Sequence, residues 1–202
     1  MKIRHFPLAV VFATISLAFS AILAAPPLEY DGKTYKTVKI GKQTWMAENL
    51  NYEAEGSVCY KNNPDNCAKY GRLYDWETAT KACPKGWHLP SYTEWSKLLR
   101  FVDNGASSAR LKADKHLKAA SGWNQLYGLS SNGTDDYGFS ALPGGFGRLG
   151  YFYGAGYFGL WWSATPYGDY NSYMFGMSSR FDGFLQHDHD NDNLYSVRCL
   201  RN

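Results

Sequence analysis

The chain has 202 residues, of which 45% are hydrophobic and 19% charged, and these proportions are typical of a folded globular protein rather than a disordered one. Aromatic residues make up 17% of the sequence, and 16 of them are tyrosines, whose rings pack while their hydroxyls hydrogen-bond. The formal net charge is +3, and it falls to +1 without Lys2 and Arg4. So small a charge supports neither a nucleic-acid partner nor an anionic membrane surface.

The first 25 residues have the three parts of a signal peptide: a cationic start, an apolar stretch over residues 6–25, and small residues at its end. We expect cleavage near Ala24 or Ala25 and a secreted or envelope-associated mature chain. A retained anchor is the alternative, since the stretch is about long enough to span a membrane, but no cationic cluster follows it. No cysteine marks a lipoprotein anchor, and no later apolar run approaches spanning length.

Four cysteines form an even set, for which disulfides are expected in an exported chain and three pairings are possible. Cys59 and Cys67 bracket a polar, turn-rich stretch and can close a local loop, in which case Cys83 and Cys199 would join the middle of the chain to its C-terminal part. Zinc is the alternative. However, no C-x-x-C spacing occurs, and His88 has no second histidine at ligand spacing.

The first expected elements are a β-hairpin and a short helix. Residues 34–40 alternate and are rich in β-forming residues, a Gly41-Lys42 turn follows, and residues 43–47 resume the strand pattern. Residues 73–83 predict a short helix with Asp75 as a candidate N-cap, because Pro84 and Gly86 stop the helical pattern.

A capping box then marks the start of a second helix. Ser91 can accept from the backbone of Glu94, while the Glu94 carboxylate can reach back to the Ser91 amide. The apolar residues that follow fall on one helical face, namely Trp95, Leu98, Leu99 and Val102. A weaker helical pattern covers residues 109–120.

The last third of the chain is dense in glycine and aromatic residues over residues 139–184, which predicts short strands and loops. A final strand is expected over residues 194–200. Early helices and late antiparallel strands favour an α+β fold. Because no repeat or linker divides the sequence, we expect a single domain over residues 28–202.

Six separated motifs, in order, resemble the Fibrobacter succinogenes major paralogous domain family, over nearly the whole chain after the leader. They lie at residues 30–35, 43–52, 71–76, 83–90, 161–165 and 195–199. The resemblance implies a C-type lectin-like fold: two short helices, a small twisted antiparallel sheet, long loops rich in glycine and aromatic residues, and a disulfide between Cys83 and Cys199. The segment from Leu89 to Trp95 is also similar to an element of the sulfatase-modifying proteins that generate formylglycine.

The resemblance implies no activity, since the family consists mainly of exported domains of undetermined function. The calcium-binding Glu-Pro-Asn, Gln-Pro-Asp and Trp-Asn-Asp motifs of true C-type lectins do not occur in the sequence. The cysteine pair late in the domain that sulfatase-modifying chemistry requires is missing as well, because Cys199 stands alone there. Function belongs to the site rather than to the fold, so neither activity is carried over.

An acidic run near the C-terminus is the one candidate metal site. Asp188, Asp190 and Asp192 match the first part of a calcium loop, but Asn193 stands where glycine is expected and Cys199 where glutamate is expected. A polar hairpin loop is therefore the preferred interpretation, and we expect no metal and no cofactor.

No catalytic residue is assigned. The sequence has no Gly-x-Ser-x-Gly elbow and no zinc-protease histidine pair. Glu48, Glu77 and Glu94 have structural explanations as carboxylates at strand ends or in first helical turns. We therefore expect a protein that is not an enzyme.

The tryptophans lie at motif or apolar positions and are expected in the core, whereas several later tyrosines alternate with glycine, aspartate and asparagine. Such loops resemble protein-binding and sugar-stacking surfaces. The candidate ligand surface comprises Tyr151, Tyr153, Tyr157, Tyr167 and Tyr170. We predict an exported, non-enzymatic binding module for an unknown protein or polysaccharide. The alternatives are an envelope-associated enzyme or enzyme accessory, and a structural envelope protein.

Overall fold

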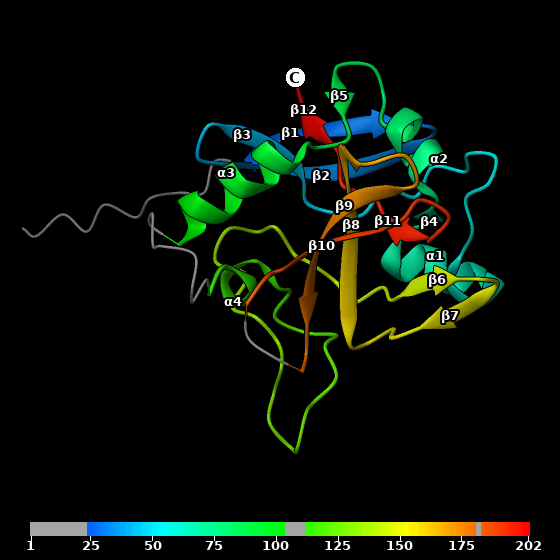
Figure 1. Ribbon diagram of the computed structural model, residues 1–202. Coiled ribbons are helices and arrows are strands. Elements are labelled where there is room, and N and C mark those ends of the chain that lie inside the picture. Colours follow the sequence, from blue (N-terminus) through cyan, green and yellow to red (C-terminus); the bar gives the residue numbers. More distant parts are fainter. Residues whose placement is uncertain (1–23, 104–111, 181–182) are drawn as a thin grey trace, which may run out of the picture.

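The computed structural model describes residues 24–103, 112–180 and 183–202, and most of the expected signal peptide lies outside this part of the chain. Two five-stranded sheets and a two-stranded hairpin form the fold, with short helices around them. Figure 1 shows the first sheet across the top of the view, the second running down the centre, and α3 on the opposite side from α1 and α2. The fold is therefore of the expected α+β class, with few helices and mostly antiparallel strands.

The first sheet has the order β1-β2-β3-β12-β5. Its strands are β1 (Ala24–Tyr30), β2 (Lys33–Ile40), β3 (Gln43–Met46), β12 (Leu200–Arg201) and β5 (Trp87–His88). The predicted hairpin is confirmed as β2 and β3, which pair antiparallel from Ile40 opposite Gln43 to Thr37 opposite Met46. Gly41 makes the turn with a φ of 60°, a value that favours glycine.

The second sheet has the order β10-β9-β8-β11-β4, and a separate hairpin joins β6 to β7. The strands are β10 (Leu185–Asp190), β9 (Asn171–Ser178), β8 (Phe158–Tyr167), β11 (Tyr195–Ser196), β4 (Leu73–Tyr74), β6 (Phe146–Arg148) and β7 (Tyr151–Tyr153). The β11–β8 pair is parallel.

The expectation of one final strand over residues 194–200 was wrong. β11 pairs with β4 and β8 in the second sheet, whereas β12 pairs with β3 and β5 in the first. Between them the chain crosses from sheet to sheet, and the carbonyls of Val197 and Cys199 accept from Leu50 and Met46. The two halves of residues 194–200 thus pair with different sheets, and the sequence of this segment alone does not indicate the division.

The helix expected over residues 73–83 is shorter than predicted. It is α2 (Trp76–Ala82), because Leu73 and Tyr74 are drawn into pairing with β11 as β4. Asp75 is the N-cap as expected, and its carboxylate accepts from the Thr78 amide at 2.7 Å.

The second expected helix is confirmed as α3 (Tyr92–Val102), with both halves of the capping box formed. The Glu94 carboxylate accepts from the Ser91 amide at 2.8 Å, and the Ser91 hydroxyl accepts from the Glu94 amide at 3.3 Å. The predicted apolar face of α3 is buried. Only α4 (Ala113–Leu117) forms within the weaker pattern, whose residues 109–111 lie outside the described chain.

The expectation of a loop between Cys59 and Cys67 was wrong in part, because this stretch contains helical structure. The expectation of two short helices was therefore incomplete. A 3₁₀ turn, η1 (Tyr60–Asn62), leads into α1 (Pro64–Tyr70). Pro64 occupies the first helical position, where its missing N–H costs nothing, and the Asn63 side chain accepts from the Asp65 amide at 2.9 Å. The same asparagine and proline that suggest a turn also begin a helix.

Two buried clusters, one on each side of the second sheet, form the core. Successive residues of a strand point to opposite faces, so Trp161 packs with Trp45, Trp95 and Phe175, while Trp162 packs in the cluster around Tyr74. These four tryptophans are fully buried as expected, whereas Trp76 and Trp87 are only partly covered. In the described part of the chain, no helix has the length and apolar character needed to cross a membrane.

Candidate functional site

Four of the five tyrosines of the candidate ligand surface are exposed. Tyr151 and Tyr153 lie on β7, and Tyr167 and Tyr170 lie at the turn between β8 and β9. Tyr157 is partly buried, with the Arg180 guanidinium 5.7 Å from its ring centroid. Two surface clefts have volumes of about 520 and 400 Å³, and none of these five tyrosines lines either of them.

These tyrosines belong to two separate places rather than one surface. The Tyr153 ring contacts Phe146 across the β6–β7 hairpin, with centroids 5.5 Å apart, whereas Tyr167 contacts Tyr173 at 5.2 Å. Figure 1 shows the β6–β7 hairpin projecting at one side, away from the turn that joins β8 to β9. A single ligand would reach both groups only if it were large.

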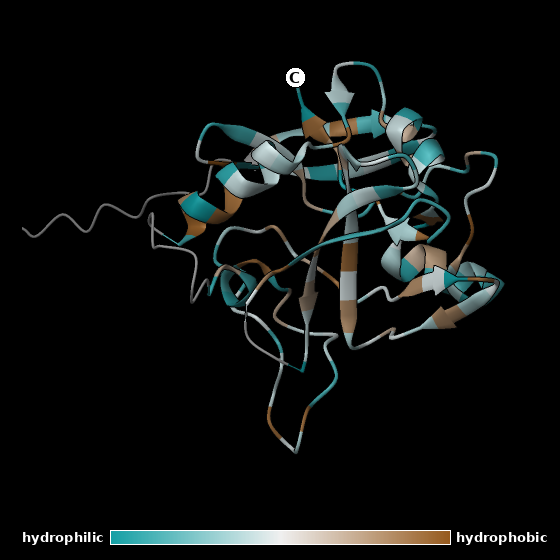
Figure 2. Cartoon of the chain, viewed as in Figure 1, coloured by the Kyte–Doolittle hydropathy of each residue, from teal (hydrophilic) through white to brown (hydrophobic). Residues whose placement is uncertain are grey.

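Sequence reasoning missed three of the strongly exposed hydrophobic side chains, which lie at two hairpin tips. Tyr127 is 94% exposed, and its neighbour Leu129 is also exposed. Leu149, at the turn between β6 and β7, is 82% exposed and precedes the exposed Tyr151. Figure 2 shows hydrophobic colour on the loop that descends lowest in the view, where residues 126–129 lie.

The two tips share an unfavourable backbone geometry. Tyr127 and Leu149 both have a φ of 50°, and the glycines that follow them have φ values of 77° and 79°. Two successive positive φ angles in a two-residue connection define a type I′ turn, whose first position favours asparagine, aspartate or glycine. The turn between β1 and β2 has this geometry and does use Asp31, with a φ of 50°. The sequence signal that could have indicated these turns is a Tyr-Gly or Leu-Gly pair between polar or strand-forming residues.

Side chains with a Cβ lose roughly 1–2 kcal/mol in the left-handed region, and asparagine and aspartate recover part of it through local hydrogen bonds. Tyrosine and leucine recover none. At Tyr127 and Leu149 the chain therefore accepts backbone strain and also leaves a large apolar side chain in water. Strain of this kind is concentrated at functional positions.

We expected the acidic run near the C-terminus to be a polar hairpin loop, and this was wrong for most of it. The run mostly forms the strand β10, which pairs residue by residue with β9. The Asp188 carboxylate accepts from the Asn171 amide group at 2.9 Å, and Asp190 accepts from the Asp192 backbone at 3.0 Å. Asp188 and Asp190 are two positions apart and so lie on one face of β10, whereas Asp192 lies beyond the end of the strand, and each of the first two carboxylates already has its own partner. The described residues hold no cluster of three or more histidine, cysteine or acidic side chains that could bind a metal.

Beside the acidic run, His187 and His189 lie on one face of β10, with ring centroids 6.4 Å apart. Burial lowers the pKa of His189, and His187 lowers it further. His189 is therefore mainly neutral at pH 7, and its ring contacts the buried Tyr195 ring edge-on at 5.9 Å.

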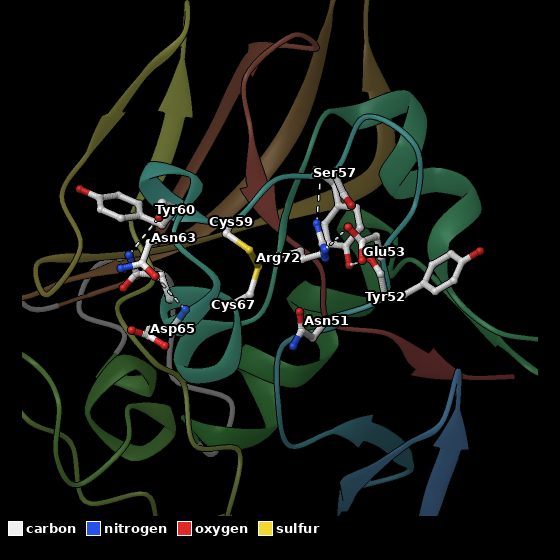
Figure 3. The surroundings of a disulfide bond; sticks show 12 residues. Asn51, Tyr52, Glu53, Ser57, Cys59, Tyr60, Asn63, Asp65, Cys67 and Arg72 are labelled. Atoms are coloured by element: carbon white, nitrogen blue, oxygen red, sulfur yellow. Dashed lines mark hydrogen bonds and ion pairs between the residues drawn. A yellow bond between two sulfur atoms is a disulfide. The ribbon is translucent and has the colours of Figure 1, made fainter.

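Both expected disulfides form: the resemblance implied the bond between Cys83 and Cys199, and the turn-rich stretch between Cys59 and Cys67 suggested the other. Cys83, which ends α2, is bonded to Cys199, 116 residues later, and Cys59 is bonded to Cys67 on α1. Figure 3 shows the second bond tying α1 to the preceding loop, with the Arg72 guanidinium between Ser57 and Glu53 on the other side. Since every cysteine is bonded, none is left to bind zinc.

Fold and surface together define a disulfide-tied α+β domain that presents exposed apolar side chains on short hairpins. The sequence model of the Fibrobacter succinogenes major domain matches residues 38–201, which is most of the chain. The chain therefore belongs to the Fibrobacter succinogenes major domain family, as the motifs indicated. No curated protein and no solved structure matches the chain.

Proposed function

We propose that this chain is an exported, non-enzymatic binding module that docks a partner protein on its two hairpin tips, Tyr127 with Leu129 and Leu149 with Tyr151. The tips lie apart in Figure 1, so the partner is a protein large enough to span both. The observation that carries the proposal is the exposure of Tyr127 and Leu149 in the left-handed region. Neither the exposure of these side chains nor the backbone strain stabilises the fold. Burial of the side chains against a partner would offset both costs.

The kind of side chain favours a protein over a polysaccharide. Sugars are recognised by hydrogen bonds to their hydroxyls and by stacking on flat aromatic rings, and a branched aliphatic side chain offers neither. Leu129 and Leu149 instead offer apolar surface that a partner protein can cover, and the adjacent Tyr127 and Tyr151 are of a residue type enriched among the anchors of protein interfaces. Tyr167 and Tyr170 form a separate exposed group that we place outside this contact.

Extracytoplasmic location and a C-type lectin-like architecture are part of the proposal. Two disulfides support an oxidising compartment, in keeping with the signal-peptide pattern at the start of the sequence. The bond from the end of α2 to the segment before β12 supports the C-type lectin-like fold, in which a long disulfide commonly joins a helix to the last strand. The likeness of the Leu89–Trp95 segment to sulfatase-modifying proteins would then reflect a shared fold and no shared chemistry.

The test uses the exported, oxidised protein on arrays of cell-surface proteins and of glycans. Leu149→Asn and Tyr127→Asn fit the type I′ turn, so they remove the apolar tip without disturbing the fold. We expect binding to a protein that weakens at least tenfold in each variant. Tyr170→Asn and Lys97→Gln, which change exposed side chains elsewhere, should bind as the parent does.

Three results would overturn the proposal. Binding to glycans alone would shift the ligand class to polysaccharide. Turnover of a chromogenic substrate panel without any binding would favour the envelope-associated enzyme or enzyme accessory. Self-association at micromolar concentration, with no other partner, would favour a structural envelope protein.

A further inference from the structure

A cleft of about 520 Å³ lies on a different part of the surface from the hairpin tips. One side is β2 around Lys33 to Lys36, the other is the end of α1 around Lys69 to Gly71, and the floor is the segment that follows β3. Its volume is within the range of small-molecule sites in proteins. Gly71 lets the floor and α1 approach closely, since a Cβ there would lie 2.7 Å from the Leu50 carbonyl oxygen.

Cations outnumber anions in the lining of the cleft. Lys33, Lys36 and Lys69 come from two facing elements, and Glu48 is the one carboxylate that lines the cleft among the described residues. The Glu48 carboxylate already accepts from the Lys36 backbone amide at 2.9 Å. In the part of the chain that is described, none of the three lysines forms an ion pair.

The lysine ammonium groups have weak partners. Lys33 Nζ lies 3.4 Å from the Asn51 carbonyl oxygen, a long hydrogen bond, and Lys69 Nζ lies 4.8 Å from the Tyr70 ring centroid. Neither contact neutralises the charge. Both ammonium groups retain free N–H donors, from which an oxyanion could accept hydrogen bonds.

The lining of the cleft adds a neutral donor, the Tyr35 hydroxyl. The Tyr35 residue is only 4% exposed, and its hydroxyl oxygen accepts from the Asn51 amide at 3.2 Å. Among the described residues that hydroxyl has no acceptor for its own proton, and burial keeps its pKa above the ordinary value, so it stays a donor at neutral pH. Behind Asn49, outside the lining of the cleft, lies the buried guanidinium of Arg198, which forms no ion pair with the carboxylates of the described residues.

We propose that this cleft binds a small anionic ligand whose carboxylate or phosphoryl oxygens meet Lys33, Lys36 and Lys69, with Tyr35 donating from the lining. The side chains of Ala47 and Leu142 give the cleft an apolar part, so the anionic group is carried on a compact organic body. This site is independent of the hairpin tips, and its failure would leave the proposed protein contact untouched.

The experiment titrates the oxidised protein with D-glucuronate, inorganic phosphate and D-glucose at constant ionic strength, followed by amide chemical shifts. We expect saturable shifts at the cleft residues with glucuronate, phosphate or both, and none with glucose. Glucuronate alone would identify a carboxylate ligand, and phosphate alone a phosphoryl ligand. Equal shifts with glucose, or no shifts with either anion, would overturn the proposal.

Variants decide whether the lysines are responsible. Lys36→Gln and Lys69→Gln should each weaken anion binding about two- to fivefold, the range for a solvent-accessible ion pair, and the loss should shrink as salt rises. Lys39→Gln, on the same strand but outside the cleft, and Leu149→Asn, at the hairpin tip, should bind as the parent does. Equal losses in the Lys39 and Lys36 variants would show a general charge effect and overturn the site.

Discussion

The side-chain oxygen of Asn49 accepts a hydrogen bond from Nη2 of Arg198 at 2.8 Å, although the two residues are 149 positions apart. The same oxygen accepts from Nε of Arg198 and from the Trp161 indole, while the Asn49 amide group donates to the Tyr70 carbonyl and the Ser196 hydroxyl. Burial lowers the pKa of Arg198 to about 9, which Asp135 and Glu48 partly offset, so the guanidinium is still charged at neutral pH.

Asn49 therefore joins α1, β8 and the C-terminal segment while it satisfies a buried cation. Asn49→Ala should lower the free energy of unfolding by about 3–5 kcal/mol, because it removes the acceptor of Nε and Nη2 of Arg198 and of the Trp161 indole, and, among the described residues, leaves the guanidinium only its bond to the Phe139 carbonyl. Urea unfolding followed by tryptophan fluorescence measures the loss. Asn51→Ala is the matched control, since Asn51 contributes hydrogen bonds through its backbone, and it should change stability by less than about 0.5 kcal/mol. Similar losses in both variants would contradict this role.

Local signals in the sequence predicted local structure well. The capping box of Ser91 and Glu94 and the Asp75 cap each depend on residues three positions apart, so a few letters are enough to find them. The Asn49–Arg198 contact, and the division of the C-terminal run into β11 and β12, depend on partners far away in the chain. Nothing near those residues specifies them.

The candidate site was predicted only in part for a related reason. Counting tyrosines located exposed rings on β7 and at the β8–β9 turn, but Tyr127 and Leu149 stand out through their backbone conformation. A Leu-Gly or Tyr-Gly pair is compatible with many structures. Only the three-dimensional turn shows that the leucine is strained as well as exposed.

The two disulfides should contribute unequally to stability. In the chain-entropy model the Cys83–Cys199 bond, which closes a long loop, contributes about 4–5 kcal/mol and the Cys59–Cys67 bond about 2–3 kcal/mol. We expect the double variant Cys83→Ala with Cys199→Ala to lose the larger amount in guanidinium unfolding. The double variant Cys59→Ala with Cys67→Ala should lose less and act mainly on α1. The reverse order would show that native-state contacts, rather than loop closure, decide the contribution.

Stability should decrease in acid partly through Glu94. Burial raises the pKa of its carboxyl, but the Ser91 amide and hydroxyl and the His88 ring together outweigh burial, so the pKa lies below its usual value. The stabilisation is therefore present above the unfolded-state pKa of about 4.3 and is lost as pH falls through the folded-state pKa. Glu94→Gln keeps a capping-box side chain without the titration.

In the Glu94→Gln variant, urea unfolding between pH 6 and pH 3 should show a shallower loss of stability, with a decrease at pH 7 of less than about 1 kcal/mol. Glu77→Gln is the control. Lys81 lowers the pKa of Glu77 too, but that pair is exposed to solvent and is screened by salt. An unchanged pH dependence in the Glu94 variant at high salt would contradict the assignment.

Calcium should not stabilise the protein through the acidic run. Asp188 is held by Asn171 and Asp190 by the backbone of Asp192, and the described residues contain no cluster of three or more ligating side chains. A ligand that binds only the folded state raises the melting temperature in proportion to the logarithm of its concentration. We expect no such rise with millimolar calcium, compared with magnesium as the control ion. A calcium-specific rise that Asp190→Asn abolishes would show a site here after all.

The hairpin tips give a prediction in which stability and binding change in opposite directions. Leu149→Asn places a favoured residue at the first position of a type I′ turn and removes an exposed leucine, so the free energy of unfolding should increase by about 0.5–1 kcal/mol. For a chain of this size that is a rise of roughly 1–4 °C in melting temperature, which calorimetry resolves. Asp31→Leu makes the reverse change in the same kind of turn and should lower the melting temperature by a similar amount. If Leu149→Asn instead lowers stability, the leucine has a structural role, and the argument that Leu149 is retained for a partner fails.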